Sequence, residues 1–445
     1  MTLKRLILSV IALAVIVFGL IVTGIWGPNG HNPAPEQQVQ TTQTPPGMSR
    51  GEYVAKMSDC TACHTTEKDK PFAGGLGMPL PIGTLYSTNI TPDKETGIGN
   101  YSLDDFKRVL REGVRKDGGH LYPAMPYTEY TKLSDNDIAA MYDYFMNSVQ
   151  PVKQANRPND IPALLSMRWP LAIWNWMFHE QGAYQTQQDK GAEWNRGAYL
   201  VQGSTHCGTC HTPRGVAMQT TANDEIETGF LSGADLAGWH AFNISNDNAN
   251  GLGDWSNDEI VQYLKTGSVA GKAQAAGPMA EAVENSFRFL TDDDLNAIAV
   301  YLRSVPGVSE GSTSRYAQGE AVAQDLQLRG LPIETTREEM PGEYLYMANC
   351  STCHDADGSG SPDGYYPSVY HNSVVGSEKS GNLIQVVLHG VKRDTNDGEV
   401  FMPAFGQHLS DDQIATLVNF LTDTYGQGNA QVEPQDVAEL RATAE

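Results

Sequence analysis

All six cysteines of this 445-residue chain fall into three pairs of one pattern, and each pair is followed directly by a histidine. The pattern is Cys-x-x-Cys-His, and its copies are Cys60-Thr-Ala-Cys63-His64, Cys207-Gly-Thr-Cys210-His211 and Cys350-Ser-Thr-Cys353-His354. The first cysteines of successive copies are 147 and 143 residues apart. A period of this length indicates tandem domains and not a solenoid of short repeats.

This pattern fits the attachment site of a c-type haem. Two thiols one helical turn apart can each form a thioether to a haem vinyl group, and the adjacent imidazole then lies within reach of the iron. A zinc ribbon would pair two Cys-x-x-Cys units a short distance apart, and a thioredoxin-like motif would lie in a βαβ unit, for which no strand signal is seen. We predict three covalently bound haem c groups, attached through Cys60, Cys63, Cys207, Cys210, Cys350 and Cys353, with His64, His211 and His354 as axial iron ligands.

Other features recur with the cysteines. A Gly-x-Tyr precedes each pair, a middle helix ends at a glycine, and a last helix begins at a hydroxyl residue with an acid or amide three residues later. Each last helix has apolar residues at offsets 4, 7, 8 and 11 and an aromatic residue at offset 10, which indicates one buried face. The recurring positions are Gly51, Gly197 and Gly342; Gly113, Gly267 and Gly390; and Ser134, Thr291 and Ser410. The first two copies also share Asn89-Ile90 and Asn243-Ile244.

The sixth iron ligand decides what a haem protein can do, because an open position permits catalysis and a methionine favours electron transfer. In each copy one methionine follows the glycine of the middle helix by 12 residues, in a segment that contains proline. We predict these residues, Met125, Met279 and Met402, as the second axial ligands in Pro-containing loops. The alternative is that they only fill the core. The eight other histidines do not recur at equivalent sites.

The N-terminus predicts a membrane anchor. Residues 6–26 form a run of 21 residues without a charge, after Lys4 and Arg5, and a helix of this length spans a hydrocarbon core. A cleaved secretory signal is the alternative, but the run exceeds a typical apolar region of such signals and no A-x-A-like site follows. We expect a single-pass inner-membrane protein whose bulk faces the periplasm.

The remaining segments complete the predicted organisation. We expect the anchor at 1–26, a flexible linker at 27–47, domains at 48–150, 193–306 and 338–428, linkers at 151–192 and 307–337, and a tail at 429–445. The first of these linkers holds four large aromatic residues between 169 and 178, which predicts either a docking surface or packing between the first two domains. The net charge of −23 and the lack of a basic cluster exclude nucleic acid as a partner.

Longer motifs give a resemblance to a known family. They are Gly51-Glu-Tyr-Val-Ala, Ile82-Gly-Thr-Leu-Tyr-Ser-Thr-Asn-Ile-Thr-Pro-Asp93, Leu121-Tyr-Pro-Ala-Met-Pro-Tyr127, Met167-Arg-Trp-Pro-Leu171 and His206-Cys-Gly-Thr-Cys-His-Thr-Pro-Arg-Gly215. With them the chain resembles the trihaem cytochrome c subunit of membrane-bound bacterial dehydrogenases that act on alcohols, gluconate or related sugars, and aldehydes. The resemblance implies electron transfer from a catalytic subunit to ubiquinone or another respiratory acceptor. That subunit would use a flavin, pyrroloquinoline quinone or a molybdenum cofactor.

We therefore expect an all-α protein with three tandem class I cytochrome c domains after an N-terminal transmembrane helix, without substrate chemistry of its own. One alternative is a self-sufficient multihaem oxidoreductase with one open haem site, for which Met279 is the position to watch. Another is an electron carrier that docks directly to a terminal oxidase.

Overall fold

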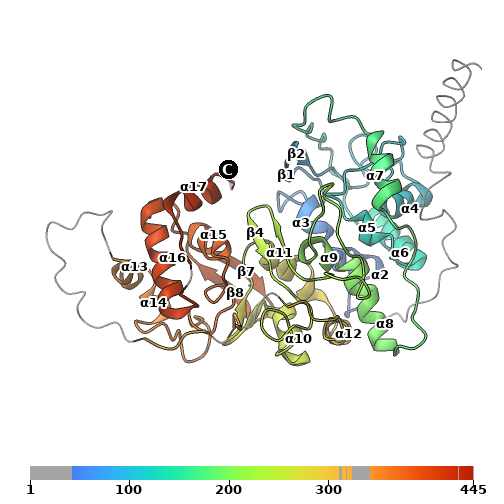
Figure 1. Ribbon diagram of the computed structural model, residues 1–445. Coiled ribbons are helices and arrows are strands. Elements are labelled where there is room, and N and C mark those ends of the chain that lie inside the picture. Colours follow the sequence, from blue (N-terminus) through green and yellow to red (C-terminus); the bar gives the residue numbers. More distant parts are fainter. Residues whose placement is uncertain (1–42, 310–312, 317, 323–340, 429, 444–445) are drawn as a thin grey trace, which may run out of the picture. The chain divides into compact units, whose positions relative to one another are not determined.

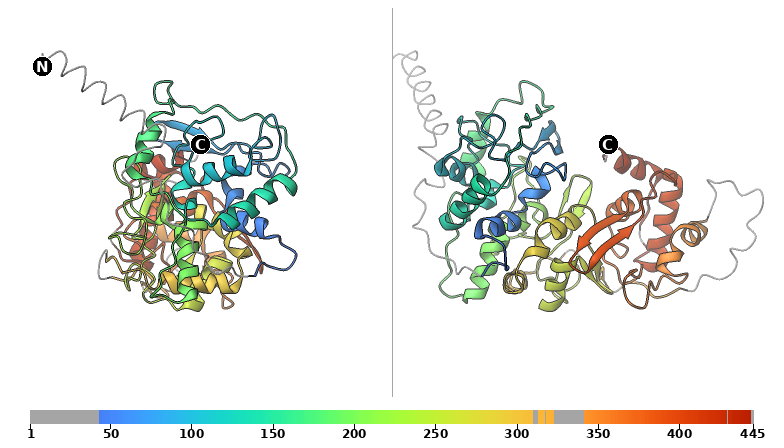
Figure 2. Two further views of the ribbon diagram at one scale, coloured as in Figure 1. Left: turned by 90° about the vertical axis from the view of Figure 1, so that its right-hand side faces the viewer. Right: turned by 180° about the vertical axis from the view of Figure 1, so that it is seen from behind.

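The computed structural model describes residues 43–309, 313–316, 318–322, 341–428 and 430–443 (Figure 1). The chain divides into two compact units. Unit 1 is the part up to Thr209 together with Gly215–Thr220, and unit 2 is Cys210–Arg214 together with the chain from Thr221 onward. Both units are mostly helical with a few short strands, as the two further views in Figure 2 show. The expected helical class is thus confirmed.

Unit 1 contains the first cysteine pair and the aromatic-rich segment. Its elements are α2 (Arg50–Met57), α3 (Cys60–His64), β1 (Gly77–Leu80), β2 (Gly83–Tyr86), α4 (Leu103–Glu112), α5 (Tyr127–Tyr130), α6 (Asp135–Asn147), α7 (Pro170–Phe178), α8 (Ala192–Tyr199) and the π-helix η1 (Leu200–Ser204). Helix α9 (Cys207–His211) carries the second pair, and the boundary between the two units falls within it.

Unit 2 contains the third cysteine pair. Its further elements are β3 (Ala234–Leu236), β4 (Trp239–Ala241), α10 (Asn257–Thr266), β5 (Ser268–Val269), β6 (Ala273–Gln274), α11 (Gly277–Asn285), the 3-10 helix η2 (Phe287–Phe289), α12 (Asp292–Leu302), α13 (Gly342–Asn349), α14 (Ser351–His354), α15 (Gly381–His389), β7 (Val391–Thr395), β8 (Gly398–Met402), α16 (Asp411–Tyr425) and α17 (Pro434–Ala442). Within this unit, helices α13, α15, α16 and α17 pack around a common apolar core.

The recurring helix signals form the caps that the sequence predicts. Ser134, Thr291 and Ser410 each accept a hydrogen bond from the backbone N–H three residues later and so begin α6, α12 and α16. The middle helices α4, α10 and α15 end at glycines with φ values of 63°, 73° and 70°, where a left-handed conformation favours glycine. The apolar stripe of each last helix is buried, apart from the half-buried Tyr142.

The Gly-x-Tyr signal has a packing reason in α2 and α13. A Cβ atom on Gly51 would lie 1.9 Å from the carbonyl oxygen of Ala140 in α6, and a Cβ on Gly342 would lie 2.4 Å from the Cβ of Phe420 in α16. Both glycines therefore allow the first helix of a repeat to cross its last helix at close range. In both crossings the aromatic residue at offset 10, Tyr144 or Phe420, lies against the glycine.

Short β-hairpins are the elements that the sequence did not predict. The described residues form four two-stranded antiparallel sheets, β1–β2, β3–β4, β5–β6 and β7–β8. In the last of these, Val391 pairs with Met402 and Arg393 pairs with Val400. The segment after residue 429, expected to be a tail, also differs, because it contains helix α17, which packs on α15 and α16.

The predicted localisation, a single-pass protein of the inner membrane, is contradicted. Among the residues that the structure describes, no helix is both long and apolar enough to cross a membrane. The longest of them, α16, has 15 residues, which at about 1.5 Å each cover about 22 Å of a hydrocarbon core of about 30 Å. The predicted helix at 6–26 and the linker residues up to 42 lie outside the described residues.

Candidate functional site

Each cysteine pair lies on one short turn of helix. Helices α3 and α9 begin at the first cysteine and end at the histidine, and α14 has Cys350 as its N-cap residue. All six cysteines lie within the described residues, none of them forms a disulfide, and all are partly buried. Burial raises the pKa of Cys60 and of Cys350 to about 12, so both thiols are uncharged at neutral pH. Each copy therefore presents two thiols and an imidazole on one turn of helix.

The three imidazoles make the same hydrogen bond. The Nδ1 atom of His64 lies 2.6 Å from the carbonyl oxygen of Thr88, that of His211 lies 2.6 Å from Phe242, and that of His354 lies 2.8 Å from Pro367. Because a carbonyl oxygen can only accept, Nδ1 carries the proton and donates in each case. This fixes one tautomer and leaves Nε2 with a lone pair that can bind a metal.

Burial also keeps these rings neutral. It lowers the pKa of His211 to about 4 and shifts the pKa of His64 and His354 in the same direction. A neutral imidazole is the form that ligates a transition metal, because a protonated ring has no free lone pair.

The backbone oxygen of each histidine is held as well. It accepts a hydrogen bond from a glycine N–H, at 2.8 Å from Gly74, 2.7 Å from Gly233 and 2.9 Å from Gly360. All three glycines have positive φ values. At Gly74 and Gly360 a Cβ atom would lie within 2.5 Å of backbone atoms of the chain that turns past it. At these turns the chain passes close to the histidine, so that a backbone carbonyl lies within hydrogen-bond distance of Nδ1.

Sequence reasoning missed the carbonyl partners, although a signal for two of them was present. Thr88 and Phe242 directly precede the shared Asn89-Ile90 and Asn243-Ile244. The side-chain oxygen of Asn89 accepts from the N–H of Thr91, and that of Asn243 accepts from the N–H of Ser245. The recurring asparagine therefore folds a tight turn immediately after the carbonyl that accepts from the histidine.

The three predicted methionine ligands lie in different local structures. Met125 lies in a loop before α5, as expected, whereas Met279 lies in the first turn of α11 and Met402 is the last residue of β8. The expectation of a Pro-containing loop is thus wrong for Met279 and Met402. Pro278 lies in the first turn of α11, where proline is favoured.

The third copy brings its predicted ligands together around one apolar cavity in unit 2. The cavity is lined by Cys350, Cys353, His354 and Met402, with aliphatic and aromatic side chains of α15, β7 and β8 around them. Two thiols, a neutral imidazole and a thioether on an apolar wall are the donor set that a haem c requires. These residues therefore fit the group. For all three methionines, Met125, Met279 and Met402, ligation stays a prediction.

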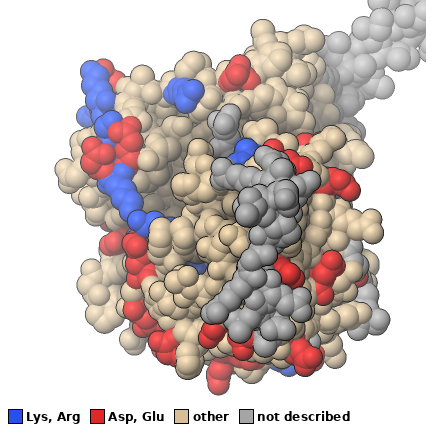
Figure 3. All heavy atoms as spheres, turned by 90° about the vertical axis from the view of Figure 1, so that its left-hand side faces the viewer, with Lys and Arg blue, Asp and Glu red and all other residues tan. Residues whose placement is uncertain are grey.

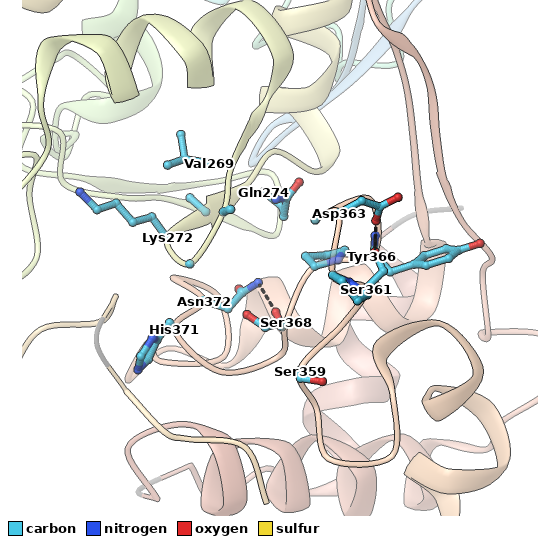
Figure 4. A pocket seen from close by; sticks show the side chains of 16 residues that line it. Val269, Lys272, Gln274, Ser359, Ser361, Asp363, Tyr366, Ser368, His371 and Asn372 are labelled. Carbon is cyan, nitrogen blue, oxygen red and sulfur yellow. Dashed lines mark hydrogen bonds between the residues drawn. The ribbon is translucent and has the colours of Figure 1, made fainter.

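A second, polar cavity adjoins the first, and it has a volume of about 280 Å³. In Figure 4, Val269, Lys272 and Gln274 of the β5–β6 hairpin lie on one side of it, and the loop from Ser359 to Asn372 forms the other. The two cavities share Gln274 and Tyr366 in their walls. The apolar cavity therefore has a polar edge.

The aromatic-rich part of the predicted linker 151–192 forms helix α7. Trp174 donates from its indole nitrogen to the carbonyl oxygen of Ala217, 2.8 Å away. Trp169 and Met177 are about half exposed, at 47% and 52%. Both expectations for this segment, a docking surface and packing between domains, stay open.

The surface agrees with the acidic composition. On the face shown in Figure 3, acidic side chains are scattered widely and basic side chains gather along one side. A continuous basic patch of the kind that binds phosphate backbones is not seen on this face.

Comparisons with known proteins agree with this chemistry. Residues 195–306 match the family model described as cytochrome c, and residues 337–421 match cytochrome C oxidase, cbb3-type, subunit III. These domain matches imply covalently bound haem c.

Three curated relatives are similar over most of the chain. The fructose dehydrogenase cytochrome subunit of Gluconobacter japonicus is 42% identical, over 89% of this chain and 83% of the relative. The gluconate 2-dehydrogenase cytochrome c subunit of Pantoea cypripedii is 44% identical, over 88% and 89%. The alcohol dehydrogenase (quinone) cytochrome c subunit of Gluconobacter oxydans is 43% identical, over 89% and 82%. The chain thus belongs to the family of cytochrome c subunits of dehydrogenase complexes, whose part is electron transfer and not substrate catalysis.

Proposed function

We propose that this chain carries three haem c groups and passes electrons between a catalytic dehydrogenase subunit and a respiratory acceptor such as ubiquinone. The observation that carries the proposal is the repeated imidazole geometry. In all three copies Nδ1 donates to a backbone carbonyl and Nε2 is left to bind iron. When bound, each haem supplies an iron that accepts and releases one electron.

The chain's own residues then have separate roles. The cysteine pairs would hold the group covalently, and His64, His211 and His354 would bind its iron. Met125, Met279 and Met402 would supply the second ligand to each iron, which favours a high reduction potential. The three domains that hold them are 48–150, 193–306 and 338–428.

The partner follows from the names of the relatives. They are cytochrome subunits of dehydrogenases for fructose, gluconate and alcohol. We propose a catalytic subunit of this class, with a flavin, pyrroloquinoline quinone or molybdenum cofactor, as the electron donor.

Spectroscopy of the full chain tests the proposal. We expect three haems per chain by the pyridine haemochrome assay and low-spin spectra in both oxidation states. A dominant high-spin signal that binds carbon monoxide would contradict it, because such a signal requires an open sixth position. To test the methionines singly, each of Met125, Met279 and Met402 is replaced by alanine, and each variant is expected to convert one third of the haem to that open form. The exposed Met177→Ala is the matched control.

A further inference from the structure

Arg393 is the largest fully buried side chain of the described residues, with no exposed surface. It lies in β7, two residues after Val391, and pairs with Val400 across the hairpin. Since side chains alternate along a strand and paired residues share a face, Arg393 projects from the same face as Met402. The apolar cavity that holds the third set of predicted ligands has both residues in its wall.

Two of the three guanidinium nitrogens have acceptors in the second repeat. Nε donates to the carbonyl oxygen of Thr266 at 2.9 Å, and Nη1 donates to that of Ala275 at 2.5 Å. Gly267 makes this approach possible, because a Cβ atom there would lie 2.5 Å from Nε. Arg393 is thereby held across the loop that leads from α10 to Met279.

The third nitrogen, Nη2, has no hydrogen-bond partner among the described residues, although it is buried. Within the same residues no carboxylate forms an ion pair with Arg393. A buried guanidinium without a counter-charge and with unused donors destabilises the folded protein. Such a group indicates an anionic acceptor that occupies the cavity when the protein is complete.

We propose that Arg393 is a positioning residue that donates from Nη2 to a propionate carboxylate of the haem attached at Cys350 and Cys353. Haem c is apolar except for its two propionates, so it matches a cavity with apolar walls and one buried cation. The inference rests on the proposed function at this site. It goes further by naming the residue that orients the haem and raises its potential, since a nearby positive charge favours the reduced iron.

The test compares Arg393→Gln with Lys392→Gln in the full holoprotein. Lys392 is the adjacent residue on the opposite face of the same strand, its side chain is 63% exposed, and its loss removes the same charge. Haem content is measured first, by the pyridine haemochrome assay, and the potentials are then measured by spectroelectrochemical titration. The titration resolves one component for each haem. In Arg393→Gln we expect the reduction potential of one of the three components to fall by about 59 mV, which corresponds to a tenfold lower ratio of reduced to oxidised haem at a fixed potential.

Met402→His identifies the component, because bis-histidine ligation lowers the potential of the third haem. Lys392→Gln is expected to leave all three components in place. Unchanged potentials in an Arg393→Gln protein with three haems would overturn the inference, as would an equal shift in Lys392→Gln or a shift of another component.

If Arg393→Gln does not fold, the reduction potentials of Arg393→Lys test the inference instead. Lysine keeps the charge but lacks the planar fork, so a smaller shift of the same component supports the inference and no shift overturns it. A wild-type chain that lacks the third haem would instead contradict the proposed function.

Discussion

Gly342 lies where α13 crosses α16, and the crossing leaves no room for a side chain. We expect Gly342→Ala to lower the free energy of unfolding of unit 2 by about 1–3 kcal/mol, the usual cost of overpacking. The added methyl carbon would lie 2.4 Å from the Cβ of Phe420. Urea unfolding followed by circular dichroism measures the change.

Gly381→Ala is the matched control, because its Cβ would lie 3.9 Å from the nearest atom, Cδ1 of Leu440. That variant should be as stable as the wild type or slightly more so. Equal losses in both variants would show that packing at the crossing is not the cause.

Asp137 has a structural role that the sequence pattern did not predict. As the acid three residues after Ser134 it was expected to support a helix cap, but it is buried and accepts two hydrogen bonds from Arg50, at 2.8 and 2.9 Å. Tyr199 donates to it as well, at 2.7 Å. We expect Asp137→Asn to destabilise unit 1 by about 2–4 kcal/mol, because Arg50 would keep its charge without a partner. Thermal unfolding measures this.

Asp143→Asn, on the exposed side of the same helix, provides the comparison and should change the stability by less than about 0.5 kcal/mol. Similar effects from both aspartates would exclude the buried ion pair as the reason.

At the level of elements, helix starts and ends were predictable and strands were not. A hydroxyl cap, an acid three residues later and a terminal glycine each stabilise a helix end through local contacts. These residues can therefore be recognised in the sequence itself. The strands of β1–β2 and β5–β6 have two to four residues, too few for an alternating pattern to be visible. The pairing that brings Arg393 and Met402 to one face is set by the β7–β8 hairpin, whose five-residue strands show no alternation of apolar and polar residues.

The cap of α4 predicts a pH dependence. Asp105 accepts from the N–H of Ser102 and pairs with Lys116, and these contacts lower its pKa from 3.8 to about 2. A lowered pKa in the folded state stabilises the protein above the unfolded pKa, and this contribution is lost as the pH falls through about 2. The stability difference between the wild type and Asp105→Asn should therefore be constant above about pH 5 and shrink between pH 4 and 2.

Urea titrations at a series of pH values measure this difference. Asp104→Asn removes a neighbouring, exposed charge of the same first turn and separates the cap from a general charge effect. A difference for Asp105→Asn that grows as the pH falls would contradict the assignment.

For the whole molecule, sequence periodicity gave three repeats, whereas the contacts group the chain into two units. The spacing of motifs reports where units of sequence recur, but it does not report how strongly neighbouring repeats pack. The third repeat and the part of the second repeat from Thr221 onward share unit 2, partly through the buried Arg393, which donates to the carbonyl oxygens of Thr266 and Ala275. No sequence pattern indicates that a single arginine in a strand will form hydrogen bonds to a neighbouring repeat.

We therefore expect the holoprotein to unfold in two steps. Replacing both Cys350 and Cys353 by serine should lower the midpoint of the step that belongs to unit 2, because a covalently held haem contributes to its core, and leave the other step unchanged. Differential scanning calorimetry combined with limited proteolysis assigns each step to its unit. A single transition, or equal shifts of both, would show that the units do not unfold independently.

The hydrogen bond from each histidine Nδ1 to a backbone carbonyl also bears on the speed of electron transfer. On the proposed ligation, a ring that is held by the main chain would turn little when the charge on the bound iron changes by one. Few atoms then need to move as an electron arrives or leaves, so the reorganisation energy is small. On the proposed ligation, the hydrogen bond that selects the tautomer would therefore also favour rapid electron transfer at each of the three histidines.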